Sequence, residues 1–253
     1  ARLVLVRAPA GFGKTTALAQ CRSDLQSQDV RTAWLTLDSA DNDPSRFLNG
    51  LAEALGTLGA PVPADRTPDA LLRMVDEIGG DGHPFAIFLD DLETVQDPVV
   101  LSLVRELVDH LPRQGQMYIG SRIQPEVGTA RLRARGQLVE ISVDELRFSL
   151  DETLAFFGRE GAVALSADAV ALLHSRTEGW VAALWLASMA IERHPEPTAF
   201  VARFSGSSAL IADYLAEDVL KGHPGAPIIA DVKAHIGTQK VHDDITLVVL
   251  KHR

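Results

Sequence analysis

A glycine-rich stretch near the N-terminus has the residue types and spacing of a phosphate-binding loop. Ala8–Thr15 follows the pattern GxxxxGK[ST], except for alanine at the first position, which shapes the turn and contacts no phosphate. Gly11 and Gly13 let the backbone N–H groups point at phosphate oxygens. Lys14 is expected to reach the β- and γ-phosphates, and Thr15 to complete the coordination of Mg²⁺. The stretch predicts a site for a nucleoside triphosphate, with seven nucleotide-binding residues: Ala10, Gly11, Phe12, Gly13, Lys14, Thr15 and Thr16.

A second stretch supplies carboxylates of the kind that such a site needs. The apolar run Phe85–Leu89 is followed directly by two aspartates. We expect Asp90 to hold Mg²⁺ through water, and Asp91 to polarise an attacking water, with Glu93 as the second choice for that base. Adjacent carboxylates at a strand end also cap helices or face solvent, but this alternative loses weight beside Lys14–Thr15.

The next apolar run, Gln116–Gly120, is followed by Ser121 and Arg122. In an open parallel sheet, ligands bind at the edge where the strands end. Two roles are open for Arg122: it senses the γ-phosphate, whose oxygens match its fork, or it forms a structural salt bridge. The predicted catalytic residues are therefore Lys14, Asp91 and Arg122, and the predicted metal ligands are Thr15 and Asp90.

Strands and helices alternate over residues 1–145. Apolar runs predict strands at 3–6, 32–37, 85–89, 116–120 and 138–141. Asp43-Pro44, Thr67-Pro68 and Asp97-Pro98 each place a capping side chain before a proline, which is typical of a helix start. Strands that are apolar throughout and alternate with helices indicate an α/β fold, with a parallel sheet sandwiched by helices. We expect residues 1–145 to form a P-loop nucleotide-binding domain.

From Ser149 onward the pattern is helical only. A capping box at Ser149–Glu152 begins the first helix, and further helical runs cover 166–176, 179–193, 197–204 and 207–220. We expect a helical lid domain at 146–220, and a short tail at 221–253 that is no independent domain.

Composition restricts the possible partners. The net charge of −10 argues against nucleic-acid binding along the whole chain. The arginines between Arg113 and Arg135 could face phosphate or a partner, but we favour a basic surface that faces solvent. Cys21 is the only cysteine, so the chain forms no internal disulfide, as fits a reducing cytosol. No apolar run reaches the 18–20 or so residues that span a bilayer. We expect a cytoplasmic protein without membrane contact, and natural sequence upstream of the first strand.

The chain resembles the nucleotide-binding core of the STAND class of signalling ATPases, and most of all the maltose-activator (MalT-like) type of large ATP-binding LuxR-like bacterial regulators. The matching blocks are Val6–Thr16, Ala33–Asp38, Phe88–Asp91, Ser121-Arg122, Asp144–Ser149, Thr177–Leu184, Phe204–Ser207 and Asp213–Leu220. The resemblance implies a switch module that binds ATP or ADP with Mg²⁺, hydrolyses ATP slowly and self-associates on activation. It also implies that Trp180 flanks the adenine, although an aromatic residue on an apolar helix face equally belongs to a core.

The resemblance has limits. Family members continue with a winged-helix domain, a helical-repeat sensor and a DNA-binding helix-turn-helix, which this chain does not contain, so no direct DNA binding is expected from it. Two further functions stay open: a nucleotide-binding scaffold without turnover, and a small-molecule P-loop kinase.

The tail resembles a different family, the metal-dependent serine/threonine phosphatases of the sporulation and stress-regulator type. The matching blocks are Ile228–Val232 and His242–Leu250, and the resemblance places a metal-binding aspartate at Asp243. About 30 residues are too few to form that enzyme. We therefore favour a fusion or a rearranged gene over phosphatase activity.

Overall fold

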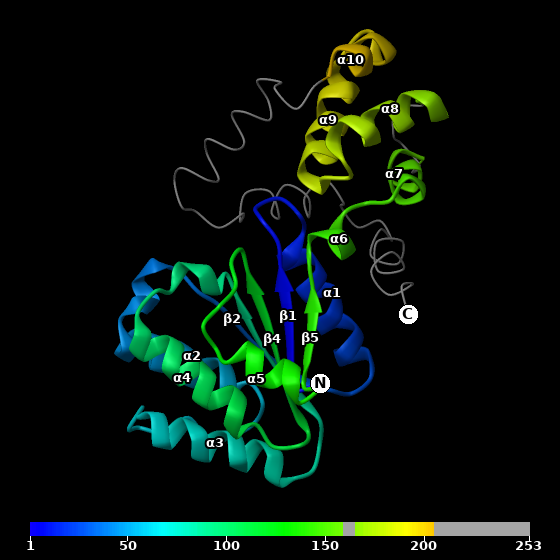
Figure 1. The fold of residues 1–253 in the computed structure, drawn as a ribbon. Helices are drawn as coiled ribbons and strands as arrows, with labels where there is room; N and C mark the ends of the chain where they lie inside the picture. The colour runs from blue at the N-terminus through cyan, green and yellow to red at the C-terminus, as the bar shows by residue number, and fades with distance from the viewer. Residues whose placement is uncertain (159–164, 205–253) are drawn as a thin grey trace. The chain divides into compact units, whose positions relative to one another are not determined.

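The computed structural model describes residues 1–158 and 165–204 (Figure 1). They belong to two compact units, one of Ala1–Ala8 with Lys14–Ser142, the other of Pro9–Gly13 with the residues from Val143 on. The helical run at 207–220 and the tail with Asp243 lie outside the described residues, and the predicted domain limits stay predictions.

The first unit contains a five-stranded parallel sheet. Its strands are β1 (Leu3–Arg7), β2 (Arg31–Thr36), β3 (Phe85–Asp90), β4 (Gly115–Ser121) and β5 (Leu138–Ile141), in the spatial order β2-β3-β4-β1-β5. All five were expected from apolar runs, because strands covered on both faces need no polar side. The register places Leu35, Leu89, Ile119 and Leu5 side by side across four strands.

Helices cover both faces of this sheet, which confirms the predicted fold class. They are α1 (Lys14–Ser27), α2 (Pro44–Gly56), α3 (Pro68–Gly80), α4 (Pro98–His110) and the short α5 (Thr129–Ala134). The main core joins α2, α3 and α4 to alternate strand residues such as Leu5 and Leu89, whereas α1 covers the opposite face with Leu18 (Figure 1). The three predicted helix starts are present, with Asp43, Thr67 and Asp97 as N-caps before proline.

Aromatic side chains and a half-buried arginine stabilise this unit further. Trp34, Phe88 and Tyr118 stack across three neighbouring strands, with ring centroids 5.3 and 4.5 Å apart. The guanidinium of Arg31 donates to the carbonyls of Leu58 and Ile78, each at 2.9 Å. Leu58 lies shortly after the last residue of α2, and Ile78 lies in the last turn of α3. Positive charge at helix C-termini is favourable, because the last carbonyls have no partner inside the helix.

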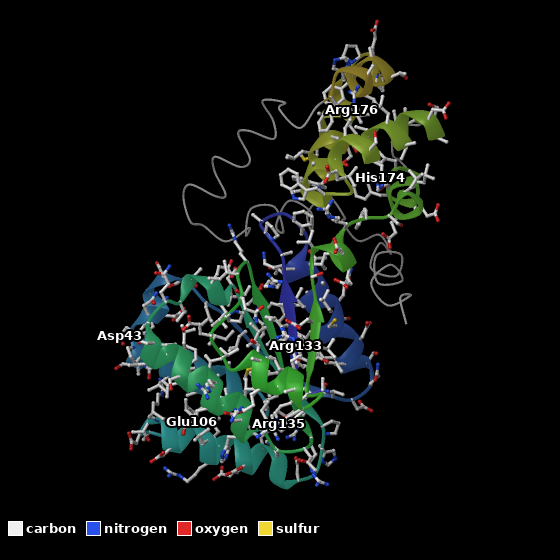
Figure 2. All side chains as sticks on the ribbon, viewed as in Figure 1. Asp43, Glu106, Arg133, Arg135, His174 and Arg176 are labelled. Atoms are coloured by element: carbon white, nitrogen blue, oxygen red, sulfur yellow. The ribbon has the colours of Figure 1, made fainter. Side chains whose placement is uncertain are left out.

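The second unit is helical in its described part. It contains α6 (Val143–Leu146), α7 (Leu150–Phe157), α8 (Ala167–Thr177), α9 (Val181–Arg193) and α10 (Pro197–Arg203). The predicted capping box of Ser149 and Glu152 begins α7. Arg176, labelled in Figure 2, donates to three carbonyls at the end of α10. None of the helices described in the two units has the length and apolar composition needed to cross a membrane.

Candidate nucleotide-binding site

The loop between β1 and α1 has the backbone conformation that its glycines permit. Gly11 and Gly13 both have positive φ, 75° and 79°, which residues with a Cβ rarely adopt. Within the described ranges, the N–H groups of residues 10–13 donate no hydrogen bond. A run of unoccupied N–H groups in alternating conformations is typical of an anion-binding nest.

Asp90 ends β3 with its carboxylate almost wholly buried, at 1% exposure. Its Oδ1 accepts the backbone N–H of Asp91 at 3.0 Å, and the hydroxyl of Thr15 donates to the same carboxylate. Burial raises the pKa of Asp90, and these two hydrogen bonds oppose the rise. Its Oδ2 is buried and has no hydrogen-bond partner among the described residues. An uncompensated carboxylate oxygen beside a hydroxyl suits a hard divalent cation, so the residues present fit Mg²⁺.

Across residues 1–158 and 165–204, no three His, Cys, Asp or Glu side chains gather into a metal cage. Mg²⁺ in nucleotide sites keeps waters and phosphate oxygens as ligands, and needs only one or two protein groups.

Asp91 follows in a left-handed backbone conformation, with φ 57°, and is 7% exposed. Burial, and after it the charges of Asp90 and Glu93, raise the pKa of Asp91 to about 6, while Lys14 and Arg122 oppose the rise. A carboxylate with this pKa is ionised at neutral pH and is a better proton acceptor than an exposed aspartate.

Lys14 is buried among these carboxylates, at 7% exposure. Burial lowers the pKa of Lys14, and the negative charges of Glu93, Asp91 and Asp90 oppose that effect. The structure therefore brings together five of the predicted site residues: Lys14, Thr15, Asp90, Asp91 and Arg122.

Arg122 forms an ion pair with Glu93 in this structure. Its Nε lies 2.9 Å from Glu93 Oε1, and its backbone N–H donates to Oε2 at 3.0 Å. Of the two roles open for Arg122, this geometry is that of the salt bridge. The sequence offered Glu93 only as a second choice of base and did not reveal this partnership.

Gly120 is a site residue that the sequence analysis missed. A Cβ on this residue of β4 would overlap Asp90 Oδ1 and come within 2.8 Å of Leu18 Cδ1. Glycine is therefore needed here so that the Asp90 carboxylate can lie across the neighbouring strand. A glycine inside an otherwise apolar strand was the available signal.

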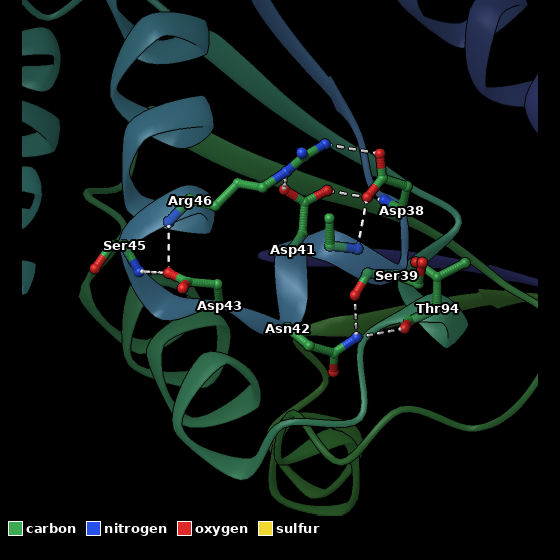
Figure 3. Close-up of polar contacts among 9 residues, drawn as sticks. Asp38, Ser39, Asp41, Asn42, Asp43, Ser45, Arg46 and Thr94 are labelled. Carbon is green, nitrogen blue, oxygen red and sulfur yellow. Dashed lines mark hydrogen bonds and ion pairs between the residues drawn. The ribbon is translucent and has the colours of Figure 1, made fainter.

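A polar network holds the segment that follows Asp91 (Figure 3). Asn42, at the end of the short helix η1 (Ser39–Asn42), donates to the carbonyls of Ser39 and Thr94, each at 2.9 Å. Its Oδ1 accepts the N–H groups of Gln96 and Asp97 at 2.7 and 2.9 Å. One amide therefore joins the chain after β2 to the chain between β3 and α4.

In the second unit, Pro9–Gly13 contacts Trp180 and its neighbours. Trp180 is half-buried, and its Nε1–H donates to the Ala10 carbonyl at 3.2 Å. Its ring lies 6.2 Å from that of Phe12. A shallow pocket of about 310 Å³ lies beside these rings.

Comparison with known proteins gives two kinds of relative. No family model matches the chain. It is 33% identical over 230 residues to the serine/threonine-protein kinase PknK of Mycobacterium tuberculosis (strain ATCC 25618 / H37Rv), covering 87% of the chain and 21% of that protein. It is 31% identical over 233 residues to the HTH-type transcriptional regulator MalT of Vibrio campbellii, covering 86% of the chain and 25% of MalT.

Among solved structures, the Aeropyrum pernix ORC1 protein in complex with DNA has a TM-score of 0.49 at 17% identity, covering 88% of this chain and 63% of that one. The chain spans a quarter or less of the length of PknK and of MalT, and is similar to one segment of each.

Proposed function

We propose that the chain is the ATP-binding switch module of a MalT-like, signal-responsive bacterial transcriptional regulator, and that it hydrolyses ATP slowly. One observation carries the nucleotide site: Thr15 donates to Asp90, whose second oxygen is buried without a partner in the described chain. Beside Lys14, this arrangement suits a Mg²⁺-bound triphosphate.

The similarity supports a module rather than a whole regulator. A kinase and a transcriptional regulator, each about four times or more as long as the matched segment, both contain it. The activities that their names describe therefore need not reside in the shared segment. Membership of the MalT-like family, self-association on activation, a cytosolic location and the absence of direct DNA binding are parts of the proposal.

Each side chain has a distinct role in the proposed hydrolysis. Thr15 and Asp90 would hold Mg²⁺, which when bound would offset negative charge on the β- and γ-phosphates. Lys14 stabilises the charge on the oxygens of the transferred group. Asp91 takes a proton from water as the water oxygen bonds to the γ-phosphorus. The bond from that phosphorus to the bridging oxygen breaks, ADP and phosphate are released, and Asp91 returns its proton to the solvent.

A second function, nucleotide binding without turnover, is favoured by one observation. The Nε of the Arg122 guanidinium is paired with Glu93 Oε1 at 2.9 Å, and this ion pair offsets charge that would otherwise act on a γ-phosphate. Phosphate release during incubation with Mg·ATP separates the two functions, because only the first predicts ADP formation above the no-protein rate.

The experiment for the site is the measurement of nucleotide affinity in a Lys14→Ala variant. Freshly purified protein is denatured to identify any nucleotide that it carries, and the stripped chain is titrated with Mg·ATP and Mg·ADP. We expect Lys14→Ala to weaken binding at least about tenfold, since charge-assisted hydrogen bonds contribute about 1.5–3 kcal/mol each. Arg135→Ala, which removes an exposed positive charge (Figure 2), serves as the control. Unchanged affinity in Lys14→Ala would refute the site.

A further inference from the structure

Two hydrogen bonds hold the carbonyl side of the glycine-rich loop. The indole N–H of Trp180 donates to the Ala10 carbonyl at 3.2 Å, and the backbone N–H of Ala182 donates to the Gly11 carbonyl at 3.0 Å. Ala182 lies in the first turn of α9, where backbone N–H groups have no partner inside the helix. The start of α9 therefore gains a partner from the loop, and the loop gains two donors.

Peptide geometry transmits this restraint to the N–H side of the loop. A trans peptide is planar, so its C=O and N–H point in opposite directions. A donor on the Ala10 carbonyl therefore sets the direction of the Gly11 N–H, and a donor on the Gly11 carbonyl sets that of the Phe12 N–H. These two N–H groups donate no hydrogen bond to any residue that the structure describes.

The side chain of Phe12 anchors the same segment. Its ring centroid lies 6.2 Å from that of Trp180, and the Arg147 guanidinium lies over the Phe12 ring, 5.9 Å from its centroid. Arg147 is itself held by the Glu178 carboxylate at 3.0 Å. The Phe12 ring thus packs among side chains of the second unit, while its backbone N–H stays available to donate to a ligand oxygen.

The close approach of α9 also explains the glycine at position 11. A Cβ on Gly11 would lie 2.6 Å from Ala182 Cβ and 2.8 Å from Trp180 Nε1, which are too close for any side chain. A Cβ on Gly13, whose φ is nearly the same, would meet no atom within 4 Å. Gly11 therefore serves two needs, its positive φ and its contact with α9.

The position of Trp180 is itself fixed by the turn before α9. Gly179 has φ 72°, and its carbonyl accepts the N–H of Phe148 at 3.0 Å. A Cβ at Gly179 would overlap the Phe148 carbonyl oxygen, so only glycine allows this pairing. The indole is thereby presented from a rigid turn.

We infer that Trp180 and the Ala182 N–H are positioning groups, which hold the phosphate loop with the N–H groups of Gly11 and Phe12 directed at the triphosphate. The inference rests on the proposed nucleotide site and assigns Trp180 a role in phosphate binding. It differs from a role in flanking the adenine, which the neighbouring pocket of about 310 Å³ would also allow.

The test compares two ligands that share phosphates and differ in the base: Mg·ATP and magnesium tripolyphosphate. Trp180→Phe keeps an aromatic ring and removes the N–H donor. We expect both affinities to fall by the same factor, about two- to tenfold, as the loss of one hydrogen bond implies. Trp185 is a half-buried tryptophan inside α9, five residues after Trp180, so Trp185→Phe is the matched control and should change neither affinity.

The outcomes separate the inference from the proposed function. A fall in ATP affinity alone, with tripolyphosphate unchanged, would show that Trp180 contacts the base and would overturn the positioning role. Unchanged affinity for both ligands would overturn it too. Failure of the wild-type chain to bind Mg·ATP would instead refute the nucleotide site. Urea unfolding of each variant shows whether it is folded under the conditions of the binding assay. A purely structural defect would lower the unfolding midpoint but leave the dissociation constant of the folded chain unchanged.

Discussion

Replacing Asp91 by asparagine is expected to stabilise the folded chain while removing its proposed base. The Asp91 carboxylate is 7% exposed and lies near two other carboxylates, so its charge is unfavourable in the folded state. Asparagine has the same shape without the charge. It also tolerates the left-handed conformation with φ 57°, so the substitution isolates the effect of charge.

The magnitude follows from the pKa of Asp91. Its rise from 3.8 to about 6 corresponds to about 3 kcal/mol, at 1.36 kcal/mol for each pH unit. The folded chain binds this proton more tightly than the unfolded chain, so the stability that the proton contributes is complete below pH 3.8 and is lost as pH rises through about 6. We therefore expect Asp91→Asn to raise the free energy of unfolding by about 1–3 kcal/mol at pH 7.5, and by about half as much at pH 5.

Urea unfolding of nucleotide-free protein at both pH values measures this difference. Trp34 lies in the same unit as Asp91, so a background with Trp180→Phe and Trp185→Phe reports the unfolding of that unit by fluorescence. Asp29→Asn is the matched control, because Asp29 is exposed and also has a left-handed backbone, with φ 60°. A free energy of unfolding that is unchanged or lower in Asp91→Asn at pH 7.5 would show that the carboxylate is well compensated, and would refute the reasoning.

Three further outcomes are expected. The rate of phosphate release from Mg·ATP should fall about tenfold for each pH unit below about 6, because Asp91 takes up a proton there. Asp91→Asn should abolish phosphate release and leave nucleotide affinity nearly intact. A rate that does not change between pH 5 and 8 would show that another group is the base. Gly120→Ala should displace the Asp90 carboxylate and weaken Mg²⁺-dependent nucleotide binding in calorimetric titrations, whereas Gly80→Ala, where a Cβ meets nothing within 4 Å, should not. Arg31→Met should lower the free energy of unfolding by about 1.5–3 kcal/mol in urea titrations, because two helix-end carbonyls lose a charged donor, and a change below about 0.5 kcal/mol would contradict this.

The elements of the first unit were predictable because each signal lies within a few neighbouring residues. An aspartate before a proline begins a helix through its own backbone neighbours, as Asp43 does by accepting the N–H groups of Ser45 and Arg46. The helix at Thr129–Ala134 was not predicted, because it has six residues and only a brief apolar pattern around the buried Leu132.

Contacts between distant residues were not predictable from local patterns. Glu93 and Arg122 are 29 residues apart, and Trp180 and Ala10 are 170 residues apart. Arg122 and Trp180 could be suspected from local patterns, but their partners depend on how strands and helices are placed in space. That Lys14 and Thr15 lie near Asp90 and Asp91 was predictable, because the residues after β1 and the carboxylate at the end of β3 both lie at the carboxyl edge of a parallel sheet. Their roles in binding and catalysis stay predictions.

The Asn42 amide makes the segment between β3 and α4 sensitive to deamidation, a slow chemical change of stored protein. Deamidation replaces the amide NH₂ with a carboxylate oxygen. That oxygen would face the carbonyls of Ser39 and Thr94, where the NH₂ now donates to both. Two attractions would become two repulsions, while the bonds from Gln96 and Asp97 to the other oxygen would persist. In deamidated molecules, only the contacts with Gln96 and Asp97 would still hold the chain after β3. A mass increase of about one dalton at Asn42 would identify these molecules.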